Sequence, residues 1–592
     1  MIYNAPIKDM LFLVNEWIGL DKVIALPGYE EVDAELFEAI LEEADRFSGT
    51  ELLSINRDGD EHGAKFENGT VTTPPGFKEA YTQFIENGWA GIDADPEHGG
   101  QGLPKVLQNL IDEMVGAVNV SFKLYTELSR GAYHLMNHAA SDEIREKYLP
   151  KMVEGVWSGT MCLTEAHCGT DLGLLNTKAV PAGDGTYKLS GTKIFITSGD
   201  HDLTENILHL VIARIEGAPA GTRGISLFLV PKVLVNDDGT LGERNTVNTA
   251  SIEHKMGIRA SATCTLNFDD ATGYLIGEEN RGLAAMFKMM NIERMTVGLQ
   301  GLGLSEIAYQ NARDYAQERT QSKAPAPRPD DSKPADPIIY QPEMQRQLLT
   351  IRSQVEGARA LSVFTGLHVD IMERSADEAA AADAENTVAL LTPVIKAHFS
   401  DLGMSSTLSA QQIYGGHGYV REHGMEQLVR DCRIAPIYEG TNEVQAIDLV
   451  ARKITGKTGE FADRFLASWQ EFLREHEDDE KVAAIVGPAA VALECLIDTT
   501  RWLREKVQSD DATARGAASQ YLRLFALTII ACMWSQIIVS IRDKEGSFYD
   551  IKRKLARFYM QQVLPETSAL AATIIQGADA LADFEVSDLV GQ

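Results

Sequence analysis

The chain has 592 residues, of which 44% are apolar and 24% are charged, so it is too long for a single core and has a globular, soluble composition. Its formal net charge of −32 argues against nucleic acid or an anionic membrane surface as the main partner. The six cysteines show no CxxC or CxH spacing, which predicts reduced thiols in a cytosolic protein and no zinc site.

The first part of the chain, residues 1–158, has a helical pattern. Acids and a lysine are mixed among the apolar residues of the first 20, which predicts that this stretch is not a signal peptide. Further on, apolar residues recur at helix spacing, as in Leu107, Leu110 and Met114. We therefore expect an N-terminal helical domain, interrupted by a glycine-rich loop at residues 88–102.

Short β-patterned runs replace the helical pattern in residues 159–280. Turn-forming Gly, Pro, Asn and Asp separate these runs, which cover residues 187–197, 208–213, 225–230 and 263–268. They predict a compact antiparallel β-domain of barrel or sandwich type. No GxGxxG follows a strand and no βαβ alternation is present, so the pattern excludes a Rossmann dinucleotide fold.

Helical patterns return in residues 281–458 and continue through an appended segment, 459–592. Four helices in the first of these stretches favour a four-helix bundle, and we expect them at 281–318, 342–375, 385–414 and 443–455. The Pro- and charge-rich residues 322–337 predict an irregular, exposed excursion. The apolar stretch 524–541 predicts a buried core helix of an appended helical domain. The fold class is therefore α+β, mainly α.

A tight turn within residues 433–445 carries the residue types that a general base needs. Pro436 prevents a continuing helix, Gly440 lets the backbone bend, and Thr441 can cap a new helix. Glu439 is therefore expected on a turn between two helices. Partial desolvation at such a place raises the pKa of a carboxylate toward working pH. An ordinary acidic turn fits the same residues.

Three further segments are candidates for ligand contacts. Residues 161–171 follow a β-run and turn at Gly169, where a hydroxyl and main-chain amides could meet the edge of a planar heterocycle. Phe195 ends another β-run and could supply an aromatic wall, although a core position fits it as well. Residues 412–419 close a long helix with three glycines in four positions, which permits close approach to a phosphate or adenine, or simply ends the helix.

Together these segments resemble, in order and spacing, the motifs of the acyl-CoA dehydrogenase family over about residues 80–455. IYEGTNEVQ resembles the catalytic segment of that family, TEAHCGTD its flavin loop, FITSG its WITNG motif and QIYGGHGY its third FAD segment. Ala166 stands where the family usually has proline, and His167-Cys168 where it has small residues, so the path of the flavin loop is open. Phe195 stands where the family usually has tryptophan and still offers an aromatic wall. The resemblance implies an N-terminal helical domain, a central β-domain, a C-terminal four-helix bundle and an appended helical domain.

The resemblance implies FAD as cofactor, Glu439 as catalytic base and no metal. It places the FAD contacts on Met161, Leu163, Thr164, Thr170, Phe195, Ile196, Thr197, Arg319, Gln321, Gln412, Gly415, Gly416, Thr441 and Glu443. It places the substrate contacts on Thr170, Asn291, Glu293, Arg294, Tyr438 and Gly440. Among these, Arg319 would meet the pyrophosphate of a neighbouring subunit's flavin, a bidentate task suited to guanidinium.

The implied reaction is α,β-dehydrogenation of an acyl-CoA to a trans-2-enoyl-CoA, with electrons passed to electron-transfer flavoprotein by a cytoplasmic homodimer or tetramer. The chain is most similar in layout to long bacterial members that act on fatty acyl-CoA or 3-(methylthio)propanoyl-CoA. An acyl-CoA oxidase, a decarboxylating glutaryl-type enzyme and a non-catalytic binding or assembly module remain alternatives. Glu293 matches the base position of isovaleryl-type members, so the chain offers two candidate bases, of which we favour Glu439.

Overall fold

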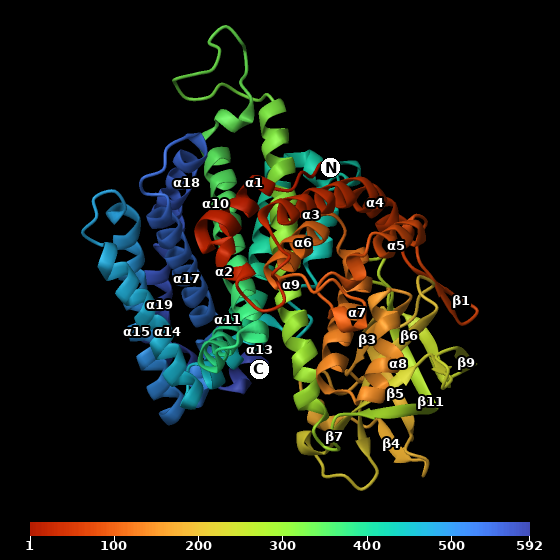
Figure 1. The fold of residues 1–592 in the computed structure, drawn as a ribbon. Helices are drawn as coiled ribbons and strands as arrows, with labels where there is room; N and C mark the ends of the chain where they lie inside the picture. Colours follow the sequence, from red (N-terminus) through yellow and green to blue (C-terminus); the bar gives the residue numbers. More distant parts are fainter. Residues whose placement is uncertain (592) are drawn as a thin grey trace. The chain divides into compact units, whose positions relative to one another are not determined.

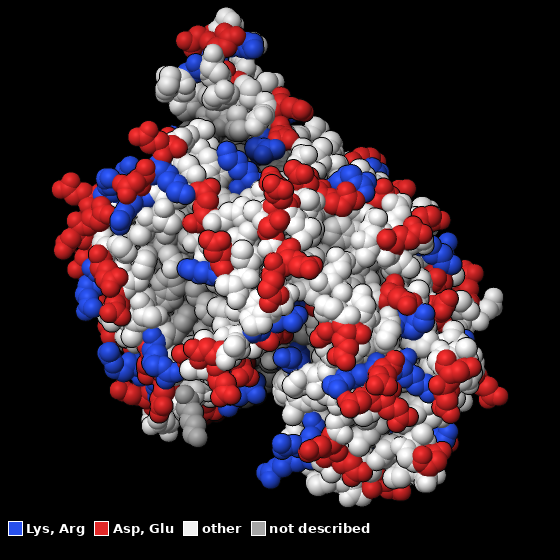
Figure 2. All heavy atoms as spheres, viewed as in Figure 1, with Lys and Arg blue, Asp and Glu red and all other residues white. Residues whose placement is uncertain are grey.

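The structure is a computed structural model that describes residues 1–591, without the side chains of residues 457, 579 and 582 (Figure 1). Contacts between residues divide the chain into two compact units. The first unit comprises residues 1–45, 104–117 and 297–592, and the second comprises residues 46–103 and 118–296. Acidic side chains are spread over the visible face rather than gathered in one patch, with lysines and arginines among them (Figure 2).

The second unit combines helices with the β-domain. Its helices include α4 (Leu53–His62), α5 (Phe77–Glu86), α7 (Val120–Ala139) and α8 (Asp142–Val153). Helix α7 begins where Asn119 accepts a hydrogen bond from the Phe122 amide at 3.0 Å, which satisfies an otherwise unpaired donor of the first turn. This helix packs on strand β3, so it supports the strand that leads into the candidate flavin loop.

The β-domain is a mixed sheet whose central strands close into a barrel. The strands are β3 (Trp157–Cys162), β4 (Lys178–Pro181), β5 (Tyr187–Thr197), β6 (Asn206–Ile215), β7 (Ile225–Pro231), β10 (Val247–Ile252) and β11 (Thr263–Ile276). Pairing runs from β11 through β5, β4, β6 and β7 and returns to β11, where Tyr274 lies opposite Leu229. Of the two expected forms, barrel and sandwich, the barrel is therefore present, and its interior is filled by buried side chains such as Val211 and Phe228.

The expectation of a purely antiparallel sheet is wrong for two pairings. Strands β3 and β4 both run parallel to β6, with Gly159 opposite Leu208 and Lys178 opposite Arg214. Neither strand precedes β6 directly in the chain, so both reach it by crossover connections, which parallel pairs require, rather than by hairpins.

Long helices form the bundle of the first unit. Helix α9 (Gly282–Glu318) enters it from the second unit, and α10 (Pro342–Arg374) and α11 (Glu378–Ile413) follow. Helix α11 begins earlier than its expected start at residue 385, because Asp377 caps it with hydrogen bonds from the amides of residues 379 and 380. The expected fourth helix is short: α13 (Asn442–Asp448) passes into a π-helical turn at Leu449–Lys453.

The appended segment packs on this bundle within the first unit. Its helices are α14 (Gly456–His476), α15 (Ala483–Ser509), α16 (Asp511–Gly516), α17 (Ala518–Ser540), α18 (Ser547–Phe558), α19 (Glu566–Gln576), α20 (Ala578–Ala582) and α21 (Val586–Leu589). Helices α15 and α17 are long and apolar enough to cross a membrane by length and composition, but 83% of the α17 window is buried in the structure. The prediction of a buried core helix at residues 524–541 is therefore confirmed.

The excursion between α9 and α10 has no regular structure apart from a short helical turn, Ile338–Tyr340, that follows it, as its composition predicted. Figure 1 shows it as a green loop beyond the ends of the two helices. Asp336 holds it together by accepting hydrogen bonds from the Arg328 guanidinium at 2.9 Å and the Ala324 amide at 2.8 Å. These bonds define the loop's base, next to the end of α9.

Candidate active site

Glu439 occupies a strained position on the expected turn. It lies between α12 (Met425–Cys432) and α13, is half-buried, and has a backbone φ of 57°. A non-glycine residue rarely adopts this left-handed conformation, which costs on the order of 1–3 kcal/mol and persists only where the surroundings impose it. Gly440 follows with a φ of 79°, so two consecutive left-handed residues reverse the chain at this point.

Buried polar groups impose that conformation. The Lys396 ammonium, on α11, donates to the Gly440 carbonyl at 2.8 Å and to Asn442 Oδ1 at 2.9 Å. Gln445 Nε2 donates to the Glu439 carbonyl at 3.0 Å. Lys396 is fully buried, so these contacts are shielded from water and correspondingly strong. Sequence reasoning missed Lys396, although a lysine inside the apolar run Pro393–Phe399 was a usable signal.

The neighbours of Glu439 are held from the bundle as well. Tyr438 donates its hydroxyl to Gln300 Oε1 on α9. Thr441 caps α13 by accepting the Val444 amide at 3.4 Å, which agrees with the predicted cap. Glu443 is exposed, and a hydrogen bond from the Thr441 hydroxyl lowers the pKa of its carboxyl. The whole turn is thus fixed to two long helices.

The two candidate flavin loops of the second unit lie side by side. The Ile194 amide donates to the Thr164 carbonyl at 2.9 Å, and buried Lys193 donates to the Leu163 carbonyl at 2.9 Å. Phe195 comes next, with a backbone φ of 57° and a side chain that is 59% exposed. An apolar ring held in a strained, exposed position next to Thr164 is a suitable wall for a planar ligand.

Glu165 fixes the path of the first loop. Its carboxylate accepts hydrogen bonds from the Asn176 amide at 2.7 Å, the Thr177 amide at 3.0 Å and Lys193 Nζ at 2.9 Å. Burial raises the pKa of Glu165, but the Lys193 charge and these hydrogen bonds outweigh it and bring the pKa to about 2. Glu165 and Lys193 escaped sequence reasoning, because their pairing across 28 residues has no local signature.

The other predicted residues of these loops differ in how exposed their side chains are. Leu163 and Ile196 are buried in the second unit, so only their main-chain atoms can face a ligand. Met161, Thr164 and Thr197 are half-buried, and Thr170 is exposed. The hydroxyls of the three threonines are therefore the side-chain donors that these predicted residues provide.

In the first unit, the end of α9 meets the glycine segment after α11. The rings of Tyr315 and Tyr414 stack with centroids 4.1 Å apart, and the Tyr315 hydroxyl lies 3.0 Å from His417 Nδ1. Gly415 has a φ of 58°, and a side-chain carbon at Gly415 or Gly416 would meet no atom within 4 Å. The backbone here is open to a ligand, as the three glycines predicted, and the stacked tyrosines that set its position were not foreseen.

Arg319, Gln321 and Gln412 are exposed beside this segment or at the base of the excursion. Arg319 Nη2 donates to Gln321 Oε1 at 3.3 Å, and the Arg319 carbonyl accepts the Ile338 amide at 2.8 Å. The guanidinium thus projects from a fixed backbone and remains accessible to an anion. Its exposure and the open glycines fit the charged pyrophosphate of an FAD molecule. In the second unit, taken by itself, the exposed Phe195 ring fits the flat aromatic face of such a cofactor.

The second candidate base has a different environment. Glu293, on α9, is 1% exposed, and its carboxylate packs directly on α7, since a Cβ added to Gly131 would lie 2.2 Å from Glu293 Oε1. Arg294 is buried and donates to Asn291 Oδ1 at 3.4 Å, whereas Asn291 is exposed. Glu293 is thus part of a helix–helix contact within the second unit.

Family models match almost the whole chain. The matches are "Acyl-CoA dehydrogenase, N-terminal domain" at residues 35–156, "Acyl-CoA dehydrogenase, middle domain" at 160–271, "Acyl-CoA dehydrogenase, C-terminal domain" at 280–455 and "Acetyl-CoA dehydrogenase C-terminal like" at 465–585.

Several known proteins are similar over most of their length. A 3-methylmercaptopropionyl-CoA dehydrogenase of Ruegeria pomeroyi is 39% identical over 98% of this chain and 99% of its own. A butyryl-CoA dehydrogenase of Syntrophomonas wolfei is 34% identical over 95% of both chains. A solved acyl-CoA dehydrogenase from Bacillus anthracis, complexed with FAD, has the same fold, with a TM-score of 0.77 at 23% identity over 98% of this chain and 93% of its own. A solved structure described as an electron transferring flavoprotein of Acidaminococcus fermentans matches with a TM-score of 0.58 at 25% identity over 71% of this chain and 98% of its own.

Proposed function

The chain belongs to the acyl-CoA dehydrogenase family, and we propose that it oxidises an acyl-CoA thioester to the trans-2-enoyl-CoA with FAD as cofactor. The observation that carries this proposal is the Glu439 turn. A half-buried carboxylate stands on a left-handed residue, and buried Lys396 and Gln445 hold the carbonyls on either side of the bend. Strain maintained by buried polar contacts is expected where a side chain must be aimed at a substrate.

In this proposal Glu439 takes the α-proton of the thioester. Its carboxylate needs a fixed direction, because a general base must lie within hydrogen-bond reach of the proton it removes. The Glu439 amide donates to the thioester oxygen, where negative charge develops as the proton leaves. FAD, when bound, supplies the acceptor for the β-hydride.

We assign the cofactor contacts to the residues that the resemblance implied. The Thr164, Thr170 and Thr197 hydroxyls and the Phe195 ring would meet the flavin, together with main-chain atoms of Met161, Leu163 and Ile196. Arg319 would meet the pyrophosphate of a second subunit, which requires a homo-oligomer. Gln321, Gln412, Gly415, Gly416, Thr441 and Glu443 would complete the site, and Thr170, Asn291, Arg294, Tyr438 and Gly440 would contact the acyl-CoA.

Two candidate bases are present, and their surroundings favour Glu439. Glu293 is enclosed between α9 and α7, against Gly131, which supports a packing role for this carboxylate. Glu439 is only half-buried, as a residue that must meet a substrate needs to be.

We further propose 3-(methylthio)propanoyl-CoA or a fatty acyl-CoA as substrate, electron-transfer flavoprotein as acceptor, and a cytoplasmic location. The relative at 39% identity over nearly the full length supports the sulfur-containing substrate. The four-domain division at residues 158, 280 and 458 also remains a proposal. An acyl-CoA oxidase is the alternative that differs in its acceptor, because its reduced flavin would react rapidly with oxygen.

Two glutamine variants test the assignment of the base. Both should purify with FAD and bind acyl-CoA, since neither change removes a proposed FAD contact. The test is anaerobic stopped-flow with 3-(methylthio)propanoyl-, butyryl- and octanoyl-CoA. The rate of flavin reduction in Glu439→Gln should be at least about 10²–10⁴-fold lower than in the parent protein. Glu293→Gln should lose less than about tenfold, because this carboxylate is enclosed between α9 and α7 and is not the proposed base.

The opposite ranking of the two variants would make Glu293 the base. Flavin reduction by none of the three thioesters in the parent protein would reject the reaction itself. Mixing the reduced parent with oxygen or with electron-transfer flavoprotein then distinguishes an oxidase from a dehydrogenase.

A further inference from the structure

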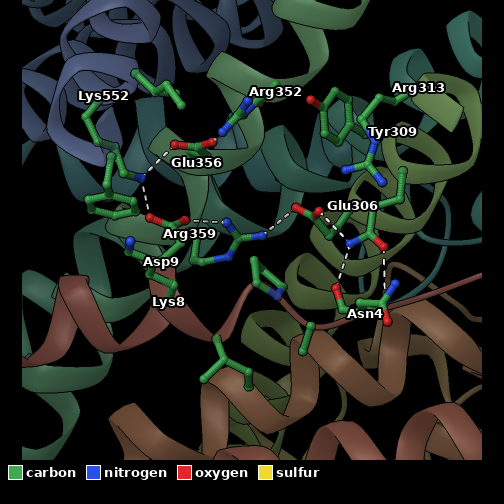
Figure 3. Close-up of a pocket in the computed structure, with 16 residues that line it drawn as sticks. Asn4, Lys8, Asp9, Glu306, Tyr309, Arg313, Arg352, Glu356, Arg359 and Lys552 are labelled. Atoms are coloured by element: carbon green, nitrogen blue, oxygen red, sulfur yellow. Dashed lines mark hydrogen bonds and ion pairs between the residues drawn. The ribbon is translucent and has the colours of Figure 1, made fainter. Parts of the chain in front are cut away.

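A pocket of about 520 Å³ lies in the first unit, apart from every residue assigned above (Figure 3). Three parts of the chain enclose it: the N-terminal segment from Asn4 to Asp9, the bundle helices α9 and α10, and helix α18 of the appended segment. These parts are far apart in sequence and meet around a cluster of charged side chains.

The acidic side chains of the pocket are already bonded. Arg359 donates to Asp9 at 2.6 Å and to Glu306 at 2.7 Å, and Lys552 donates to Glu356 at 2.6 Å (Figure 3). Arg359 and Lys552 are almost fully buried, so this network is a fixed base rather than a mobile surface. Burial lowers the pKa of Lys552, but the charges of Asp9 and Glu356 outweigh it, so its pKa is raised and the ammonium form is held.

Three more cations line the pocket and have fewer carboxylate partners than Arg359 and Lys552. Lys8 lies 4.9 Å above the Phe548 ring and pairs with no carboxylate among the described residues. Arg313 bonds Asp314 through Nε alone, at 2.6 Å, which leaves its terminal nitrogens for a further acceptor. Arg352 uses Nε for Glu356, at 2.7 Å, and also has a side-chain hydrogen bond with Tyr309.

Five cationic and three acidic side chains line the pocket, and two carboxylates outside the lining, Glu113 and Asp314, bond Arg359 and Arg313. A bound anion would therefore be held by directed hydrogen bonds from the guanidinium ends and Lys8, and not by an excess of positive charge.

The remaining wall is apolar. Phe548 and Ile551 come from α18, and Pro6 and Ile7 from the N-terminal segment. A guanidinium suits bidentate recognition of a carboxylate or phosphate, and an apolar wall suits a hydrocarbon or aromatic group. Water alone would leave the apolar wall uncovered, and a bare inorganic ion would not fill the volume.

We propose that this pocket binds a small amphipathic organic anion, with its carboxylate or phosphate on Arg313, Arg352 and Lys8 and its apolar part on Phe548 and Ile551. The site is separate from the proposed active site, since it shares no residue with it. Its occupant links the N-terminal segment, the bundle and the appended segment within the first unit.

Binding is measured by isothermal titration of the FAD-loaded full-length protein. Octanoate and phenyl phosphate serve as amphipathic probes, and inorganic phosphate serves as the charge-only probe. At least one amphipathic probe should bind saturably at one site, more tightly than inorganic phosphate. Tighter binding of octanoate than of phenyl phosphate indicates a carboxylate head group, and the reverse order indicates a phosphate.

Matched glutamine variants locate the probe. Arg313→Gln should weaken binding about tenfold or more, because a charge-assisted bond is lost. Arg346→Gln removes the same charge from an exposed position on α10 outside the pocket and should leave affinity unchanged. Lys8→Gln repeats the test from another segment if Arg313→Gln does not fold. In Glu439→Gln, which should bind acyl-CoA without rapid turnover, saturating butyryl-CoA should leave the affinity for the probe unchanged, which separates this site from the active site.

The proposal fails if no probe binds saturably at low millimolar concentration. It also fails if Arg313→Gln and Lys8→Gln bind like Arg346→Gln, or if butyryl-CoA bound to Glu439→Gln displaces the probe.

Discussion

The backbone conformation of Glu439, the candidate base, is set by side chains that are not among the proposed substrate contacts. Its left-handed backbone is held through the carbonyls of Glu439 and Gly440, which accept from Gln445 and Lys396. Asn442, which also accepts from Lys396, donates to Asp401 at 2.8 Å and so ties the turn to α11 a second time. The direction of the Glu439 carboxylate therefore depends on contacts from α11 as well as on the turn itself.

Replacing Lys396 by Met tests this positioning role. The change keeps the buried volume but leaves the Gly440 carbonyl and Asn442 Oδ1 without their charged donor, a loss of about 1–3 kcal/mol. We expect the maximal rate of flavin reduction to fall about 10- to 100-fold with little change in the half-saturating acyl-CoA concentration. Lys396→Arg should recover part of the rate. Thr407→Val, a buried change on α11 away from the turn, controls for general loosening. If Lys396→Met and Thr407→Val have equal rates, Lys396 has no positioning role.

At the scale of elements, the β-domain is a barrel whose polar interior contacts fix its loops. Strand β3, which leads into the first flavin loop, is bonded through Thr160 to His209 Nδ1 on β6 at 2.8 Å. Ser158, on the same strand, bonds His201 Nε2 at 3.1 Å. Burial, reinforced by the Lys232 charge, lowers the pKa of His201 to about 4 and that of His209 to about 3. Both histidines are therefore neutral in the folded barrel.

These shifts predict that the barrel loses stability in acid. A histidine in the unfolded chain has a pKa near 6.5. Below that pH the unfolded state therefore binds protons that the folded state does not bind. The stabilisation is complete above pH 6.5 and is lost as the pH falls toward 4, by up to about 1.4 kcal/mol per pH unit for each histidine. Hydrogen exchange of peptides from β3 and β6 should show falling protection from pH 7 to 4.5, after correction for intrinsic exchange.

A local measurement is needed because the first unit contains an opposite effect. Burial raises the pKa of Asp370 to about 6, so that carboxyl favours folding on the acid side of its titration. His209→Gln should flatten the pH dependence of protection in β3 and β6, whereas the exposed-site change His138→Gln should not. An unchanged slope in His209→Gln would show that His209 does not control the acid response.

At the scale of the whole chain, the appended segment is part of the bundle core. Helix α17 approaches α10 so closely that a Cβ at Gly357 would lie 2.6 Å from Ile530. Trp534 Nε1 donates to the Ser353 carbonyl at 3.1 Å, and buried Lys552 bonds Asp9 of the N-terminal segment. Removing the segment would uncover an apolar face of the bundle.

Ending the chain after residue 458 should therefore cost stability rather than only alter substrate range. We expect aggregation or FAD-free protein in size-exclusion chromatography, because a large buried apolar surface becomes exposed. Ending the chain after residue 577 removes only short, largely exposed C-terminal helices and should leave the melting temperature within a few degrees of the parent. A monodisperse, FAD-loaded protein ending at residue 458, with an unchanged melting temperature, would contradict the core role of α17.

Local patterns determined the elements of this protein. Periodicity located α9, α10 and α11, turn residues located the ends of β5 and the excursion, and Pro436 with Gly440 located the Glu439 turn. Each of these features depends on neighbours within a few residues, which is why sequence reasoning reached them and why the family resemblance was readable. The roles of the individual site residues and the domain boundaries stay predictions.

Tertiary structure alone decided the parallel pairing of β3 and β4 with β6, the buried Lys396 under the turn, and the Arg359 network beneath the pocket. In each case the partners are at least 36 residues apart, as Lys178 and Arg214 are. No local periodicity encodes such a pair. It forms because burying apolar surface brings the elements together, and a charge buried in that process must then find an opposite charge or a hydrogen-bond partner.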